Sequence, residues 1–152
     1  MADVEYPAQD TARVESVSEH HQLLASVMHA AERIHARLEA ALAPCGLSLA
    51  KLGALRHLAE AQQPLPLGQL AERIACVKSN VTQLIDRVES DGFVKRLPDP
   101  EDRRSVRAMI TEEGRERYQA GTDAVAAAER ALVTELDLGD RHALQQLLQR
   151  LS

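Results

Sequence analysis

Residues 67–110 read LGQLAERIACVKSNVTQLIDRVESDGFVKRLPDPEDRRSVRAMI, and this stretch decides the fold. Its first part predicts a short helix over 67–75 and, after a brief turn, a second helix over 78–91. The apolar stripe of the second helix, at the spacing i, i+3, i+4, i+7, consists of Val81, Leu84, Ile85 and Val88. Gly92 follows at the position where a left-handed residue commonly ends a helix.

After Gly92 the period of the apolar residues changes from that of a helix toward two, the period of a strand. Residues 93–97 and 105–110 predict two strands, and the loop 98–104 between them contains two prolines that exclude a helix. A short helix, a second helix and a hairpin in this order are typical of a winged helix-turn-helix, in which the hairpin is the wing.

Helical patterns flank this segment on both sides. The expected flanking helices cover 17–42, 49–60, 111–136 and 141–151. Pro44 and Gly46 end the first of them, and Ser48 and Thr111 are candidate N-caps for the second and third. These helices carry more Leu, Ala and Val than one small winged domain can cover, so they could form a two-fold interface. The predicted fold class is mainly α with a small β-hairpin wing.

Charge is distributed unevenly along the chain. The formal net charge is −5, from 18 basic and 23 acidic residues, which excludes an overall basic field. From Lys78 to Arg107, however, seven basic residues stand against six acidic ones. An acidic protein can still bind a polyanion if the fold places the cations of such a segment on one face.

The sequence favours a cytoplasmic protein without a membrane span. Two cysteines, Cys45 and Cys76, are too few for a disulfide scaffold. The first residues lack the basic start and apolar core of a signal peptide, and no apolar run reaches about 18 residues.

Polar side chains remain on helix 78–91 once its apolar stripe is removed. They are Lys78, Ser79, Asn80, Thr82, Gln83, Asp86 and Arg87. Asn and Gln can each form two hydrogen bonds with adenine, and Ser or Thr can bond phosphate or a base. This face is therefore suited to the major groove of double-stranded DNA.

The wing loop provides a second candidate contact with DNA. Its two prolines limit the freedom of the backbone, so less entropy is lost on binding. Asp99 and Asp102 can bond backbone N–H groups or hold an arginine in position. Arg103 or Arg104 can then reach the minor groove, where the negative potential is deepest when the groove is narrow.

Four segments resemble the pattern of the MarR family of bacterial regulators. They are LAERI (70–74), SNVTQLIDRVESDG (79–92), DPEDRR (99–104) and ITEEG (110–114). The DPEDRR loop followed by ITEEG is the most specific part of the resemblance, which covers about 50 residues; the flanking helices fit as well. Two positions depart from the family pattern. Val77 stands where a polar N-cap is frequent, and Gln83 stands where Arg is common.

The resemblance implies a homodimeric transcriptional regulator, expected to be a repressor, that binds palindromic operator DNA. The candidate DNA contacts are Lys78, Ser79, Asn80, Thr82, Gln83, Arg87, Arg96, Asp102, Arg103 and Arg104. The expected division of the chain is a flexible N-terminus over 1–15, a helical dimerisation region over 16–45 and 111–152, and a winged helix-turn-helix DNA-binding domain over 46–110.

The resemblance also implies a small-molecule effector that releases the DNA. We expect an acidic aromatic ligand between the dimerisation helices and the winged domain. The candidate contacts are His21, Met28, Arg56 and His57.

Other functions remain open from the sequence. Either cysteine could make the regulator redox-responsive, although no cationic neighbour clearly lowers a thiol pKa. The histidines could hold a metal between helices, although no H-x-x-x-H pair occurs. A winged-helix module that binds protein instead of DNA is a further alternative, which Arg103 and Arg104 disfavour. No arrangement of catalytic residues can be assembled, so we expect neither an enzyme nor a cofactor.

Overall fold

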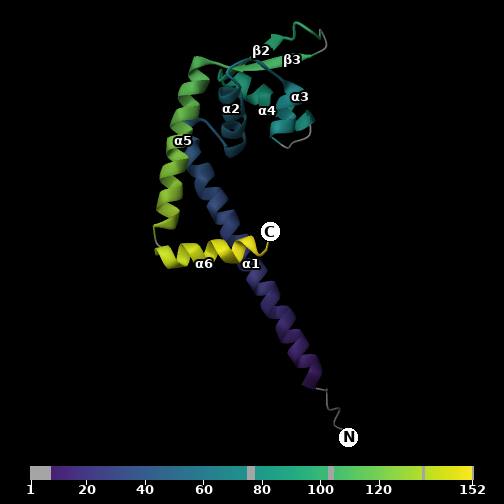
Figure 1. Cartoon of the computed structure of the whole chain (residues 1–152), viewed down its shortest axis with the longest axis vertical. Helices are drawn as coiled ribbons and strands as arrows, with labels where there is room; N and C mark the ends of the chain where they lie inside the picture. Colours follow the sequence, from purple (N-terminus) through teal and green to yellow (C-terminus); the bar gives the residue numbers. More distant parts are fainter. Residues whose placement is uncertain (1–7, 75–77, 103–104, 135, 152) are drawn as a thin grey trace. The chain divides into compact units, whose positions relative to one another are not determined.

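The computed structural model describes residues 8–74, 78–102, 105–134 and 136–151 (Figure 1). It contains two compact units, residues 1–36 and residues 37–152. The helices and strands are α1 (Ala8–Leu42), a 3-10 turn η1 (Ala43–Cys45), α2 (Leu49–Ala61), β1 (Leu65–Pro66), α3 (Leu67–Arg73), α4 (Lys78–Ser90), β2 (Val94–Pro98), β3 (Val106–Ile110), α5 (Glu112–Val133) and α6 (Leu138–Gln149).

The first unit is formed by the N-terminal part of α1. The helix begins at Ala8, earlier than the start near residue 17 that the apolar spacing predicts. Its large apolar side chains Leu23, Leu24, Met28 and Ile34 are exposed. Monomeric soluble proteins rarely leave an apolar helix face of this kind exposed to water.

Capping residues fix the ends of the helices in the second unit. Ser48 caps α2, since its Oγ accepts a hydrogen bond from the Lys51 N–H at 3.2 Å. Thr111 caps α5 by accepting from the Gly114 N–H at 3.0 Å, and its hydroxyl donates to the Gly92 carbonyl oxygen at 2.8 Å. Gly92 has φ of +82°, as the predicted end of helix 78–91 requires. All three sequence predictions are confirmed.

A three-stranded antiparallel sheet with the order β1-β3-β2 forms the wing and its base. In the register, Leu97 faces Arg107 and Leu65 faces Ala108. The hairpin of β2 and β3 follows the prediction, whereas β1 lies between the predicted helices 49–60 and 67–75, where the sequence predicts no strand. β1 has two residues, one of them a proline, and lies at the edge of the sheet. Two residues are too few to show the alternation of apolar and polar residues that predicts a strand.

The core of the second unit lies between α2, α3, α4 and the sheet. The side chains with less than 2% exposure and the largest volumes are Leu42, Leu55, Leu58, Leu70, Ile85, Val81 and Val88. The last three belong to the predicted apolar stripe of α4, and its fourth member, Leu84, is partly buried against the same core, so this stripe faces the core as expected. The fold class, mainly α with a small β wing, is confirmed.

Two glycines let α5 approach the winged region closely. A Cβ at Gly114 would collide with the backbone carbonyl oxygen of Phe93, and a Cβ at Gly121 would lie 2.7 Å from the Leu47 side chain. Packing against the Phe93 backbone therefore requires glycine at position 114, whereas a side chain at position 121 would require the Leu47 side chain to shift.

No single helix in the described part of the chain is long and apolar enough to cross a membrane. One bent pair, Glu19–Cys45 with Leu49–Ala61, satisfies length and composition when the two are taken together. The second helix of that pair buries Ala54, Leu55 and Leu58 in the protein core.

Candidate nucleic-acid interface

The polar face of α4 is exposed, as the sequence predicts. Asn80, Gln83 and Arg87 follow one another at i, i+3 and i+7, so they lie on one side of the helix. Thr82 and Asp86 are also exposed. The side chains of Lys78 and Ser79 lie outside the described part of the structure.

Arg96, the candidate contact in β2, turns toward α4. Its Nη2 lies 2.5 Å from Asp86 Oδ1 and donates to the Thr82 carbonyl oxygen at 3.3 Å. Its Nη1 lies 3.6 Å from Glu89 Oε2, and its backbone N–H donates to Glu89 Oε1 at 3.0 Å. The strand is thereby joined to the helix by charged groups that the sequence alone does not pair.

The base of the wing is held by a second ion pair. Asp99 is buried, with 8% of its surface exposed, and its Oδ1 accepts from Arg107 Nη2 at 2.8 Å and from the Glu101 N–H at 3.0 Å. The Arg107 guanidinium, which donates to Asp99, lowers the pKa of that carboxyl below its ordinary value of 3.8. The same contact raises the pKa of Arg107. Asp99 thus holds an arginine, as predicted for an aspartate of this loop, and that arginine is Arg107 of β3.

The tip of the wing is described only in part. The Asp102 carbonyl oxygen accepts from the Ser105 N–H at 2.9 Å, and the Ser105 carbonyl oxygen accepts from the Asp99 N–H at 3.3 Å. Arg103 and Arg104 lie outside the described residues. The bonds on either side of them close the loop.

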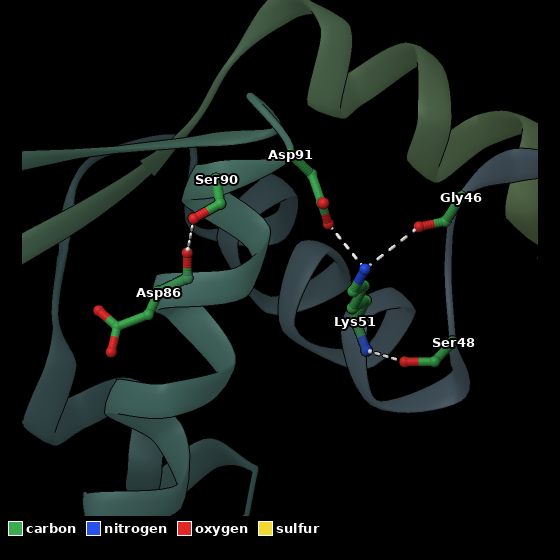
Figure 2. A network of polar contacts seen from close by, with 6 residues as sticks. All are labelled: Gly46, Ser48, Lys51, Asp86, Ser90 and Asp91. Carbon is green, nitrogen blue, oxygen red and sulfur yellow. Dashed lines mark hydrogen bonds and ion pairs between the residues drawn. The ribbon is translucent and has the colours of Figure 1, made fainter.

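The C-terminal end of α4 is fastened to α2 (Figure 2). Lys51 Nζ donates to Asp91 Oδ2 at 2.7 Å and to the Gly46 carbonyl oxygen at 3.4 Å. Ser90 Oγ donates to the Asp86 carbonyl oxygen at 2.8 Å. In Figure 2 the Asp86 carboxylate points away from the Lys51 contacts. Because 40 residues separate Lys51 from Asp91, sequence spacing gives no sign of this link.

A groove of about 410 Å³ lies between α2 and α5. It is lined by Leu49, Leu52, Gly53, Arg56, Tyr118, Thr122, Val125, Ala126 and Glu129. Of the four residues predicted to contact an effector, Arg56 lines this groove. His57 is half-buried beside Glu60 and does not, and His21 and Met28 are exposed residues of the first unit. The sequence does not predict the α5 wall of the groove, although Tyr118 is one of only three aromatic residues in the chain.

Cysteine and metal chemistry find little support in the described residues. Cys45 is a free, half-buried thiol, and Cys76 lies outside the described residues. Within the described ranges, no three His, Cys, Asp or Glu side chains come together in a way that could hold a metal ion.

Comparison with known proteins finds a family match for part of the chain. Residues 47–106 match the model of the MarR family. An uncharacterised HTH-type transcriptional regulator of Bacillus subtilis (strain 168), YkoM, is 41% identical over 63 residues, which is 41% of this chain and 41% of that protein. The chain thus matches less than half the length of this curated relative.

Solved structures share the fold over most of the chain. A probable transcriptional regulator from Pseudomonas aeruginosa has a TM-score of 0.70 at 27% identity, covering 86% of this chain and 97% of that one. A mutant MarR from E. coli, complexed with operator DNA, has a TM-score of 0.70 at 22% identity, covering 88% and 95%. The matching segment, the exposed face of α4 and the braced wing agree, so residues 47–106 resemble the MarR family and the chain shares its fold with a probable transcriptional regulator.

Proposed function

We propose that this protein is a sequence-specific DNA-binding transcriptional regulator that acts as a repressor in the cytoplasm. The observation that carries the proposal is the exposed row of Asn80, Gln83 and Arg87 on α4, next to a wing. Amide side chains on such a helix can read base edges in the major groove, and a cation can contact phosphate. The E. coli MarR of the same fold, complexed with operator DNA, supports this use of the face.

The braced wing supports a second contact in the minor groove. The Asp99–Arg107 pair fixes the ends of the two strands, so the loop between them loses less entropy on binding. Asp102, Arg103 and Arg104 remain candidates for this contact on sequence grounds.

The operator itself can be found by selecting duplexes from a random pool with the wild-type protein. We expect a palindromic sequence whose half-sites lie about one helical turn apart, roughly 34–36 Å. Arg104→Ala should then weaken binding to the selected operator and lower its salt dependence, because a phosphate or groove contact is lost. A binding curve unchanged across salt concentrations would exclude Arg104 from the interface.

A homodimer would present two such faces, with residues 16–45 and 111–152 as its dimerisation region. All residues of α6 are exposed, and they include Leu138, Leu144, Leu147 and Leu148. An apolar groove of about 470 Å³ is lined by Val133, Leu136, Arg141, Leu144, Gln145, Leu148 and Gln149. A 12-residue helix is marginal without tertiary packing, so a second copy of this face is a suitable cover.

The groove between α2 and α5 is our candidate for the effector site. Gly53 lies within α2, where glycine is less favourable than alanine by about 1 kcal/mol, and a Cβ there would meet nothing within 4 Å in the described structure. Packing therefore does not require glycine at position 53. The absence of a side chain there widens the groove. Apolar walls, Tyr118 and the guanidinium of Arg56 suit an aromatic carboxylate.

Adjacent residues offer a matched test of this site. A thermal-shift titration with benzoate and hydroxybenzoates should raise the melting temperature of the wild-type protein. Arg56→Gln should remove the shift, whereas His57→Gln, on the same helix but outside the groove, should retain it. Gly53→Leu should also remove the shift by filling the groove. Equal shifts in all four proteins would place the ligand elsewhere.

A further inference from the structure

Arg96 is attached to α4 at several points, although it belongs to the wing. Its guanidinium contacts the Asp86 and Glu89 carboxylates and the Thr82 carbonyl oxygen, which together span two turns of α4. Its backbone N–H adds a hydrogen bond to Glu89. Arg96 of β2 thus contacts acceptor groups along most of the length of α4.

We propose that Arg96 is a positioning residue that sets the spacing between the recognition helix and the wing, and that it does not bind DNA directly. The proposal rests on the DNA-binding function proposed above. Two carboxylates face the guanidinium, so its charge is offset locally and attracts a phosphate weakly. The side chain is 27% exposed, which leaves little of it available for a new partner.

The spacing matters because helix and wing are expected to enter neighbouring grooves together. When one element is bound, the second binds at an effective concentration that depends on the geometry of their connection. Just past the C-terminal end of α4, Lys51 pairs with Asp91 and so fastens the helix to α2 and not to the wing. Arg96 therefore supplies a direct charged link between the two DNA-facing elements.

Removing the acidic partners gives a test in which the two explanations predict opposite signs. Asp86→Asn and Glu89→Gln make the DNA-facing side more positive, so electrostatics alone predict tighter binding. If Arg96 acts as a positioning residue, these variants release it and weaken operator binding, by about tenfold in Kd. Tighter operator binding by Asp86→Asn would overturn the proposal.

Arg87 provides a matched control for the loss of charge. Arg96→Gln and Arg87→Gln remove the same charge from the same region, and each is titrated by fluorescence anisotropy against the selected operator and a random duplex over a range of salt. Arg96→Gln should weaken operator binding more than random binding, with an unchanged salt slope. Arg87→Gln should lower the salt slope by about 0.9, as expected for one lost phosphate contact.

Rescue by lysine separates positioning from phosphate binding. Arg96→Lys retains the charge but presents a single ammonium that cannot bridge two carboxylates and a carbonyl as a guanidinium does. We expect partial rescue at most, whereas a phosphate contact would be restored. Full rescue, or a salt slope lowered by Arg96→Gln as by Arg87→Gln, overturns the proposal. A wild-type protein that binds no duplex overturns the proposed function, and this inference with it.

Discussion

The winged region and α6 place their leucines in opposite environments. Leu55 and Leu70 are fully buried within one chain, whereas Leu144 and Leu147 of α6 remain 45% and 55% exposed. Both regions carry leucine at helical spacing, so the sequence pattern does not distinguish them. The difference teaches that the winged region completes its core alone, while α6 presents an apolar face that one chain leaves open.

The largest expected effect comes from placing charge on the open face. Leu144→Asp with Leu148→Asp should convert the proposed dimer, of about twice 16.7 kDa, into a monomer, as measured by light scattering. Because a two-fold interface contains the same face of both copies, each substitution occurs in it twice. If each leucine contributes about 1.5–3 kcal/mol when covered, the four lost side chains weaken association by at least 6 kcal/mol.

The control for this variant is the fold of the winged region. Its helical circular dichroism and its binding of a single half-site should persist, because neither leucine belongs to the buried core. A variant that stays dimeric would show that the α6 face has another role. The exposure of its leucines would then not mark the dimer interface.

A smaller effect is expected from a substitution in the buried core of the winged region. Leu55→Ala removes a fully buried side chain from the core and should lower the free energy of unfolding by about 2–5 kcal/mol. Urea denaturation at several protein concentrations measures this loss. Leu147→Ala is the matched control, and its effect should depend on protein concentration because it acts through association. A loss below 1 kcal/mol for Leu55→Ala would contradict the buried position.

Specificity should change by less than stability does. Asn80→Ala and Gln83→Ala each remove an exposed amide from α4. If the amide bonds a base edge, discrimination between operator and random duplex should fall by about 1–3 kcal/mol for each variant. Competition anisotropy measures both affinities. Equal losses on the two duplexes would mean that these residues contact only the DNA backbone.

Local features of the fold were predictable from the sequence. The caps at Ser48 and Thr111, the left-handed Gly92 and the apolar stripe of α4 depend on neighbours within a few positions, so spacing was enough. The same holds for the hairpin strands. The start of α1 at Ala8 was missed because its first turns are polar and show no apolar period.

The candidate site depends on pairings that spacing does not encode. Arg96 reads as a DNA contact in the sequence because it is basic and belongs to the wing, yet its partners lie 7 to 14 residues earlier on another element. The groove beside Arg56 needs Tyr118 from α5, which is 62 positions away in the chain. Such contacts follow from tertiary packing and not from local propensity.

The smallest effect concerns Asp99 at the base of the wing, the one charged residue that is buried among the residues that the structure describes. Because Arg107 and the Glu101 N–H lower the pKa of Asp99 below 3.8, its carboxylate stabilises the fold fully above that value. This contribution is lost as the pH falls through the lowered pKa of the folded state. Asp99→Asn should therefore differ from wild type by a constant amount between neutral pH and about pH 4, and the difference should shrink below it.

Melting temperatures between pH 7 and pH 3 test this dependence. Arg107→Gln removes the same pair from the other side, so the double variant should lose little more than either single one. Additive losses would show that the two side chains act separately. A difference between wild type and Asp99→Asn that grows on acidification would reverse the expected sign, since it would require a carboxyl whose pKa is raised in the folded protein. In that case the wing would be held by some other contact, and Arg107 would be available to bind DNA beside the proposed contacts Arg103 and Arg104.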